Sequence, residues 1–174
     1  MNLILLAGNS ISNKQWVEEL AASLAKLFAK TTVHYYDHWT TGIGEIDINK
    51  EVEMLSREIK YSDKYAILAK SAGTVVALKG IKNNKLSPLK CIFVGTAVNW
   101  AYENNIDIGE LLENYSVPTL FIQKTYDPAG SIVDLIELLQ NKRVQNSSIK
   151  EIPGSNHHYD DIELLKAEIE KFKG

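Results

Sequence analysis

The sequence contains very little cysteine: Cys91 is the one thiol among 174 residues. A single thiol cannot form a disulfide within the chain, which excludes a fold that depends on internal disulfides. Cys91 also lies in the apolar run of residues 91–94, where a thiol behaves as a small hydrophobic side chain. We therefore expect a structural cysteine rather than a catalytic nucleophile.

The sequence also lacks a long apolar run and a concentrated basic region. No apolar run reaches the roughly 18–20 residues that cross a membrane. The formal net charge is −3, and charges of both signs are spread along the chain, whereas nucleic-acid binding requires clustered basic residues. The N-terminus has neither the basic start nor the cleavage site of a signal peptide. We expect a cytoplasmic protein that binds neither nucleic acid nor membranes, and the oligomeric state stays open.

The sequence does contain enough apolar residues for a substantial core. Hydrophobic residues make up 45% and charged residues 24% of the chain, and the length suits a single domain over residues 1–174. Apolar segments of strand length alternate with segments of helical period. The expected strands are residues 3–7, 32–36, 65–69, 90–94 and 119–123, with a weaker sixth at 148–152.

The segments between these strands predict helices. They cover residues 13–29, 48–60, 72–81, 131–140 and 160–172, and Ser131 with Asp134 resembles a capping box. The alternation predicts an α/β fold with three layers, a doubly wound sheet of about six mainly parallel strands. The connection at residues 95–118 is long for such a fold. It is either a reduced lid or a covering helix at 108–114 with its approach loop.

A candidate nucleophile follows the third strand, at the carboxyl edge where parallel sheets bind ligands. Residues 69–73 read Ala-Lys-Ser-Ala-Gly and lead directly into a helix. In a nucleophile elbow the serine occupies a sharp, strained turn, and the residues two before and two after it must be small. Ala69 and Gly73 meet this requirement. The alternative is that Ser71 merely caps the helix.

This segment resembles the elbow of the α/β-hydrolase superfamily, with Ala69 in place of the usual first glycine. The resemblance implies a minimal α/β-hydrolase fold with strand order 2-1-3-4-5-6 and a triad in the chain order serine, acid, histidine. Asp127 matches the acid after the fifth strand, with Asp134 as a weaker candidate and an Asp-Pro turn as the alternative reading. The late Gly-x-x-His segment from Gly154 places the base at His157, with His158 as the alternative.

The resemblance also implies an oxyanion hole formed by two backbone N–H groups. One belongs to Ala72, directly after Ser71, and the other to the loop after the first strand, where Asn9 is the best match and Ser10 the next. Relatives often carry a histidine before the glycine of this loop, and here the residue is Ala7. The chain as a whole resembles the small branch that includes the retinoblastoma-binding-protein-9-like serine hydrolases.

These assignments predict a serine hydrolase that cleaves a small ester, thioester or amide through an acyl-enzyme and needs neither cofactor nor metal. The adjacent histidines at 157 and 158 lack the further ligands of a zinc site. Lys70 and Lys124 either favour an acidic substrate or are solvated lysines. The residues expected to line the substrate site are Ser10, Lys70, Trp100, Tyr126 and His158.

Two other functions compete with the hydrolase hypothesis. A non-catalytic binding protein with the same fold is the main alternative, because fold does not determine function. A flavodoxin-like nucleotide binder is the other, but it would need phosphate-binding loops that the sequence lacks. The glycines of residues 42–44 neither follow the first strand nor open a helix, so we expect a surface loop there rather than a dinucleotide fingerprint.

Overall fold

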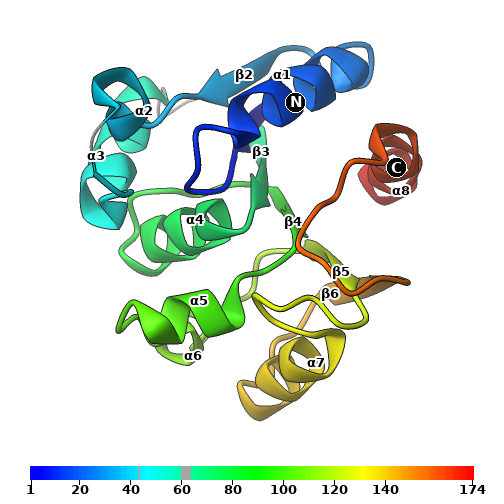
Figure 1. The fold of residues 1–174 in the computed structure, drawn as a ribbon. Helices are drawn as coiled ribbons and strands as arrows, with labels where there is room; N and C mark the ends of the chain where they lie inside the picture. Colours follow the sequence, from blue (N-terminus) through cyan, green and yellow to red (C-terminus); the bar gives the residue numbers. More distant parts are fainter. Residues whose placement is uncertain (43, 60–63) are drawn as a thin grey trace.

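The computed structural model describes residues 1–42, 44–59 and 64–174. Within these residues, six parallel strands form one sheet in the order β2-β1-β3-β4-β5-β6, and helices cover both faces (Figure 1). The predicted fold class and strand order are therefore confirmed. The strands are β1 (Asn2–Leu6), β2 (Thr31–His34), β3 (Tyr65–Lys70), β4 (Lys90–Val94), β5 (Thr119–Lys124) and β6 (Ser147–Ile152).

The helices divide into two groups by the sheet face that they cover (Figure 1). Helices α1 (Asn13–Leu24) and α8 (Ile162–Lys173) pack on one face. Five helices share a second core cluster with the opposite face. They are α3 (Ile48–Glu58), α4 (Ala72–Lys82), α5 (Val98–Glu103), α6 (Ile108–Leu111) and α7 (Ile132–Asn141). The short helix α2 (Asp37–Thr41) follows β2.

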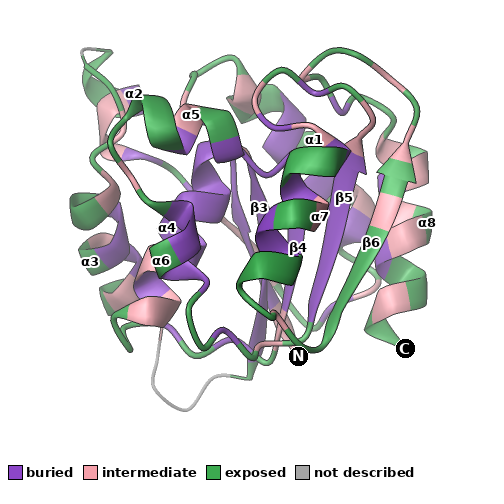
Figure 2. Ribbon diagram, turned by 90° about the horizontal axis from the view of Figure 1, so that it is seen from below, coloured by how far each residue is buried: buried purple, intermediate pink, exposed green. Residues whose placement is uncertain are grey.

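Burial follows the position of each strand in the sheet. The central strands β3 and β4 are almost entirely buried, as expected for parallel strands covered on both faces, whereas the edge strand β6 is mostly exposed (Figure 2). The weaker sixth segment of the sequence is this edge strand. Lys150 and Glu151 place charges on this edge, a feature that disfavours pairing of an open strand edge with other chains.

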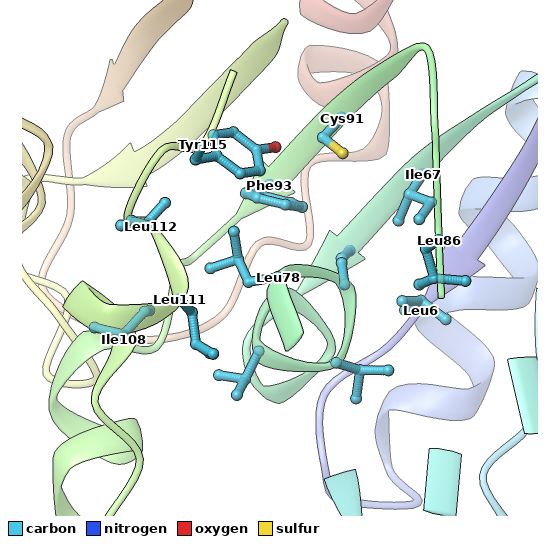
Figure 3. Close-up of a cluster of buried hydrophobic side chains, with 14 of the residues drawn as sticks. Leu6, Ile67, Leu78, Leu86, Cys91, Phe93, Ile108, Leu111, Leu112 and Tyr115 are labelled. Carbon is cyan, nitrogen blue, oxygen red and sulfur yellow. The ribbon is translucent and has the colours of Figure 1, made fainter. Parts of the chain in front are cut away.

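The core on the α4 face contains the single cysteine. Figure 3 shows Cys91 and Phe93 of β4 beside Tyr115, with Leu78 of α4 below them. Burial raises the pKa of the Cys91 thiol to about 12, although the neighbouring hydroxyl groups of Tyr115 and Thr119 act to lower it. The thiol is thus a structural group, as its apolar sequence context indicates.

The long connection at residues 95–118 packs into the same core. It forms α5 and α6, and its buried residues include Val98, Ala101 and Ile108. This matches the covering-helix alternative, although α6 ends at Leu111 rather than at residue 114.

The ends of two helices and one helix cap bear on the predictions from the sequence. Helix α1 ends at Leu24 instead of residue 29, and α3 ends at Glu58. Residue 60, the expected end of α3, and residue 43 of the expected surface loop lie outside the described residues. The capping box of Ser131 and Asp134 is present at the start of α7. No helix in the described part of the chain is long and apolar enough to cross a membrane.

Candidate active site

Ser71 is the single residue between β3 and α4, and its backbone is strained. Its φ of 53° and ψ of −125° are rarely adopted by a residue with a side chain. The turn is held by the Ser71 N–H, which donates to the Val94 carbonyl at 3.1 Å, and by Thr74, which donates to the Ser71 carbonyl. The Ser71 side chain makes no capping hydrogen bond with any described residue. Ser71 thus occupies the N-cap position of α4 without capping the helix through its side chain, and its backbone has the strain expected of a nucleophile elbow.

The small residues around Ser71 are required by close packing. A Cβ on Gly73 would lie 2.5 Å from the Ala7 carbonyl oxygen, because the first turn of α4 passes directly over the end of β1. A Cβ on Gly8 would lie 3.3 Å from Ser71 Cβ. The loop after β1 is thus in contact range of Ser71, and we name residues 8–10 the candidate oxyanion loop.

Asp127 and His157 are joined directly. His157 Nδ1 lies 2.8 Å from each carboxylate oxygen of Asp127, whose side chain is buried. The same carboxylate accepts the Ala129 N–H at 2.9 Å and the Tyr159 hydroxyl at 2.7 Å. Asp127 therefore has a fixed orientation and holds the imidazole with its proton on Nδ1.

The other ring nitrogen of His157 is available for chemistry. Nε2 is buried and has no hydrogen-bond partner among residues 1–42, 44–59 and 64–174. When Nδ1–H donates to Asp127, Nε2 carries the lone pair that a general base needs. His157 and Asp127 are thus arranged as a histidine oriented by a carboxylate, and within the described part of the chain no hydrogen bond links His157 to Ser71.

Contacts at Gly95 and Val94 place both His157 and Ser71 at the carboxyl end of β4. Gly95 follows β4, the neighbour of β3, and a Cβ on it would lie 3.1 Å from His157 Cε1 and 2.5 Å from Tyr159 Cε2. Its φ of +57° also favours glycine. His157 therefore packs over the end of β4, while Ser71 is tied by its N–H to Val94 at the end of the same strand.

Tyr159 holds the histidine loop (residues 154–160) in place and was not identified from the sequence. Its buried hydroxyl donates to Asp127 and accepts the Lys124 N–H, and its carbonyl accepts from Trp16 Nε1 at 2.7 Å. Burial, together with the charge of Asp127, raises the pKa of the phenol far above its usual range. Tyr159 thus remains a hydrogen-bond donor. The sequence signal was an aromatic residue two positions after the histidine.

Lys124 anchors the same loop from β5. Its ammonium donates to Asn156 Oδ1 at 2.8 Å and to the His158 carbonyl, and lies 5.2 Å from the centroid of the Tyr159 ring. It is thus not a freely solvated lysine. His158 is exposed on the loop surface.

The candidate oxyanion loop is held by the segment after β2. The Asn9 carbonyl accepts from His38 Nε2 and Trp39 Nε1, each at 2.8 Å, and Asn9 Oδ1 accepts the Ile46 N–H at 3.0 Å. Tyr36 donates to the neighbouring Ala7 carbonyl at 2.7 Å. His38 is not among the site residues that the sequence predicts. The available signal was a cluster of aromatic side chains with polar tips just after a strand.

The remaining predicted residues have different environments. Ala72 is the first residue of α4, so its N–H has no acceptor within the helix. Ser10 is exposed and pairs with Ser12 Oγ at 2.9 Å, and Tyr126 is 72% exposed beside Asp127. Trp100 packs partly buried against the core of the α4 face.

Lys70, in contrast, is 5% exposed, so it is not a solvated lysine.

A cavity of about 220 Å³ borders the candidate oxyanion loop. Its lining residues are Asn9, Ser10, Ile11, His38, Trp39, Gly42 and Gly44. A larger cavity of about 340 Å³ lies between the end of α4 and the segment before β5, with Asn84 and Val117 in its wall. That cavity is at the amino end of the strands, so it is remote from Ser71.

Comparison with protein-family models gave no match, and neither did comparison with curated proteins. Solved structures do match. A protein from Pectobacterium atrosepticum described as a YdeN-like hydrolase has a TM-score of 0.72 and 15% identity over 99% of this chain and 90% of its own. Est1E from Butyrivibrio proteoclasticus, solved with ferulic acid, has a TM-score of 0.71 and 13% identity, and the match covers 98% of this chain and 87% of Est1E. CarC, a serine hydrolase involved in carbazole degradation, has a TM-score of 0.73 and 14% identity, and the match covers 99% of this chain and 90% of CarC.

Proposed function

We propose, from the premise that the chain has the α/β-hydrolase fold, that it is a serine hydrolase with Ser71, His157 and Asp127 as its triad. The observation that carries this proposal is the buried, unpartnered Nε2 of His157, whose other nitrogen is held by Asp127. His157 lies at the same sheet edge as Ser71, whose backbone has the strained conformation of an elbow turn. These are the parts of an acyl-transfer site.

In the proposed reaction, His157 Nε2 takes the proton of Ser71 Oγ as the oxygen attacks a carbonyl carbon. The new oxyanion accepts hydrogen bonds from the N–H groups of Ala72 and Asn9. The imidazolium, stabilised by Asp127, then protonates the leaving group, and an acyl-enzyme remains on Ser71. Water attacks this ester with His157 again as base, and the acid is released with Ser71 regenerated.

A small ester is the proposed substrate, with a thioester or an amide as the other bonds that the same chemistry cleaves. The cavity beside the candidate oxyanion loop, at about 220 Å³, is smaller than the roughly 300–1,000 Å³ of sites for drug-sized ligands. Among the described residues, its lining contains no Lys, Arg, Asp or Glu, which favours an uncharged group. The ferulic acid bound to Est1E and the serine-hydrolase activity of CarC are consistent with this class.

Labelling with a fluorophosphonate probe tests the nucleophile. We expect the wild type to be labelled and Ser71→Ala not to be, because the probe reacts with an activated serine. Ser56→Ala is the matched control, since Ser56 is a partly exposed serine of α3 whose hydroxyl donates to the Glu53 carbonyl, and it should label as the wild type does. A folded wild type that remains unlabelled would contradict the proposal and favour a non-catalytic binding protein with this fold.

A further inference from the structure

Lys70 precedes Ser71 and carries a charge that the proposed triad does not use. Its side chain is 5% exposed, and within the described part of the chain it forms no ion pair. Burial lowers the pKa of its ammonium, against the opposing charges of Asp160 and Asp127. Burying an ammonium without a carboxylate partner costs free energy. The position therefore requires a specific explanation.

The ammonium of Lys70 is held by Asn13 and Trp16, both on α1. It donates to Asn13 Oδ1 at 2.6 Å and lies 4.9 Å from the centroid of the Trp16 ring. Lys70 faces α1 because it shares a strand face with Ala66 and Leu68, which pack in the core of that side.

Asn13 connects Lys70 to the candidate oxyanion loop. Its Nδ2 donates to the Ser10 carbonyl at 3.0 Å, and a Cβ on Gly8 would lie 3.0 Å from the same nitrogen. The amide thus contacts both ends of the loop. Because an ammonium can only donate, it fixes the oxygen of the Asn13 amide toward Lys70 and the nitrogen toward Ser10.

Trp16 connects Lys70 to the other side of the candidate active site. The indole nitrogen donates to the Tyr159 carbonyl, and the Tyr159 hydroxyl donates to Asp127. Lys70 therefore lies between the two loops that must keep a fixed relative position if one is to stabilise an oxyanion while the other delivers a proton.

We propose that Lys70 is a positioning residue that orients the candidate oxyanion loop through Asn13. This proposal rests on the proposed serine-hydrolase function and extends it to the residue before the nucleophile. The loop acts on charge that develops after Ser71 attacks, so its correct orientation stabilises the transition state more than bound substrate. Loss of Lys70 should therefore lower kcat and leave KM nearly unchanged.

The test compares Lys70→Met and Asn13→Asp with the wild type in p-nitrophenyl ester hydrolysis. Methionine keeps much of the side-chain volume without the ammonium, and aspartate keeps an acceptor for Lys70 but loses the donor to Ser10. Direct removal of an oxyanion donor costs about 10²–10³-fold in kcat, so for these indirect changes we expect about a 10-fold loss, with KM within about twofold. Lys26→Met is the control, because Lys26 is exposed after α1, and it should retain wild-type kinetics.

Each outcome separates the two proposals. A kcat of Lys70→Met and Asn13→Asp near that of the wild type would overturn the positioning role while the hydrolase function stands. A raised KM at unchanged kcat would also overturn it and make Lys70 a substrate-binding residue. If Lys70→Met does not fold by circular dichroism, Asn13→Asp decides, since it retains the buried cation with a partner. A wild type without hydrolysis or fluorophosphonate labelling would contradict the proposed function itself.

Discussion

At the scale of single residues, the candidate site depends on positions where a side chain of another size does not fit. Gly73 allows α4 to start against β1, and Gly95 allows the histidine loop to lie on the end of β4. Ser71 itself adopts a backbone conformation that costs about 1–3 kcal/mol for a residue with a side chain. The surrounding hydrogen bonds to Val94 and Thr74 maintain this strain.

Gly95→Ala should damage the site although it substitutes no proposed catalytic residue. The new methyl group would overlap Tyr159 and crowd His157 at a positive φ, so we expect a loss of about 1–3 kcal/mol in the free energy of unfolding. The displaced imidazole should also slow fluorophosphonate labelling about 100-fold, as misplacement of about 1 Å does in other sites. Urea denaturation and labelling kinetics measure the two effects.

Gly109→Ala provides the comparison for that variant. Gly109 lies in α6, and the first atom that its new Cβ would meet is the flexible end of Lys142. Labelling should proceed at the wild-type rate. Equal labelling rates for Gly95→Ala and the wild type would show that the packing of His157 on Gly95 does not matter.

At the scale of elements, β2 and α3 are joined by a buried histidine. His34 at the end of β2 contacts Glu51 and Glu58 of α3, with each ring nitrogen 3.0 Å from a carboxylate oxygen. Glu51 also accepts the Asp37 N–H at the start of α2. This cluster fixes the segment that carries His38 and Trp39, which hold the candidate oxyanion loop.

The His34 cluster predicts a pH-dependent stability. Burial alone would lower the pKa of His34, but the hydrogen bonds and charges of Glu51 and Glu58 outweigh it and raise the pKa above the ordinary value of 6.5. A raised folded-state pKa gives a stabilising contribution that is complete below pH 6.5 and is lost as the pH rises through the folded-state value. The free energy of unfolding should therefore fall over that range.

Urea denaturation at a series of pH values measures this effect, with His34→Gln as the reference. The difference in unfolding free energy between the wild type and His34→Gln should be largest at about pH 6 and decrease at higher pH. A difference that is constant with pH would contradict a charged His34 in the folded protein.

The elements also show what the sequence could and could not predict. The strands, the elbow and the capping box are local patterns, so their positions follow from periodicity and turn chemistry. The contacts of Tyr159 with Asp127 and Trp16, and of His38 with Asn9, join residues remote in sequence, so no local pattern predicts these partners. Lys70 was predictable in part, because its alternation with Leu68 places it on a buried strand face.

At the scale of the whole molecule, parallel strand order brings separate loops to one edge. Residues 8–10, Ser71, Gly95, Asp127 and the histidine loop follow β1, β3, β4, β5 and β6 in turn, so each lies at the carboxyl edge of the sheet. The sequence predicted this convergence from chain order, as ligand sites in parallel sheets require. The closer resemblance to the retinoblastoma-binding-protein-9-like branch, the cytoplasmic location and the small acyl substrate stay predictions.

Hydrolysis of a p-nitrophenyl ester by His157→Ala and His158→Ala tests the proposed triad most directly. The two residues are adjacent, but His157 contacts Asp127 with a buried free Nε2, whereas His158 is exposed. We predict a loss of about 10³-fold or more in kcat for His157→Ala, as for other triad deletions, and a far smaller loss for His158→Ala. The opposite ranking, or equal activity of His157→Ala and the wild type, would contradict the triad.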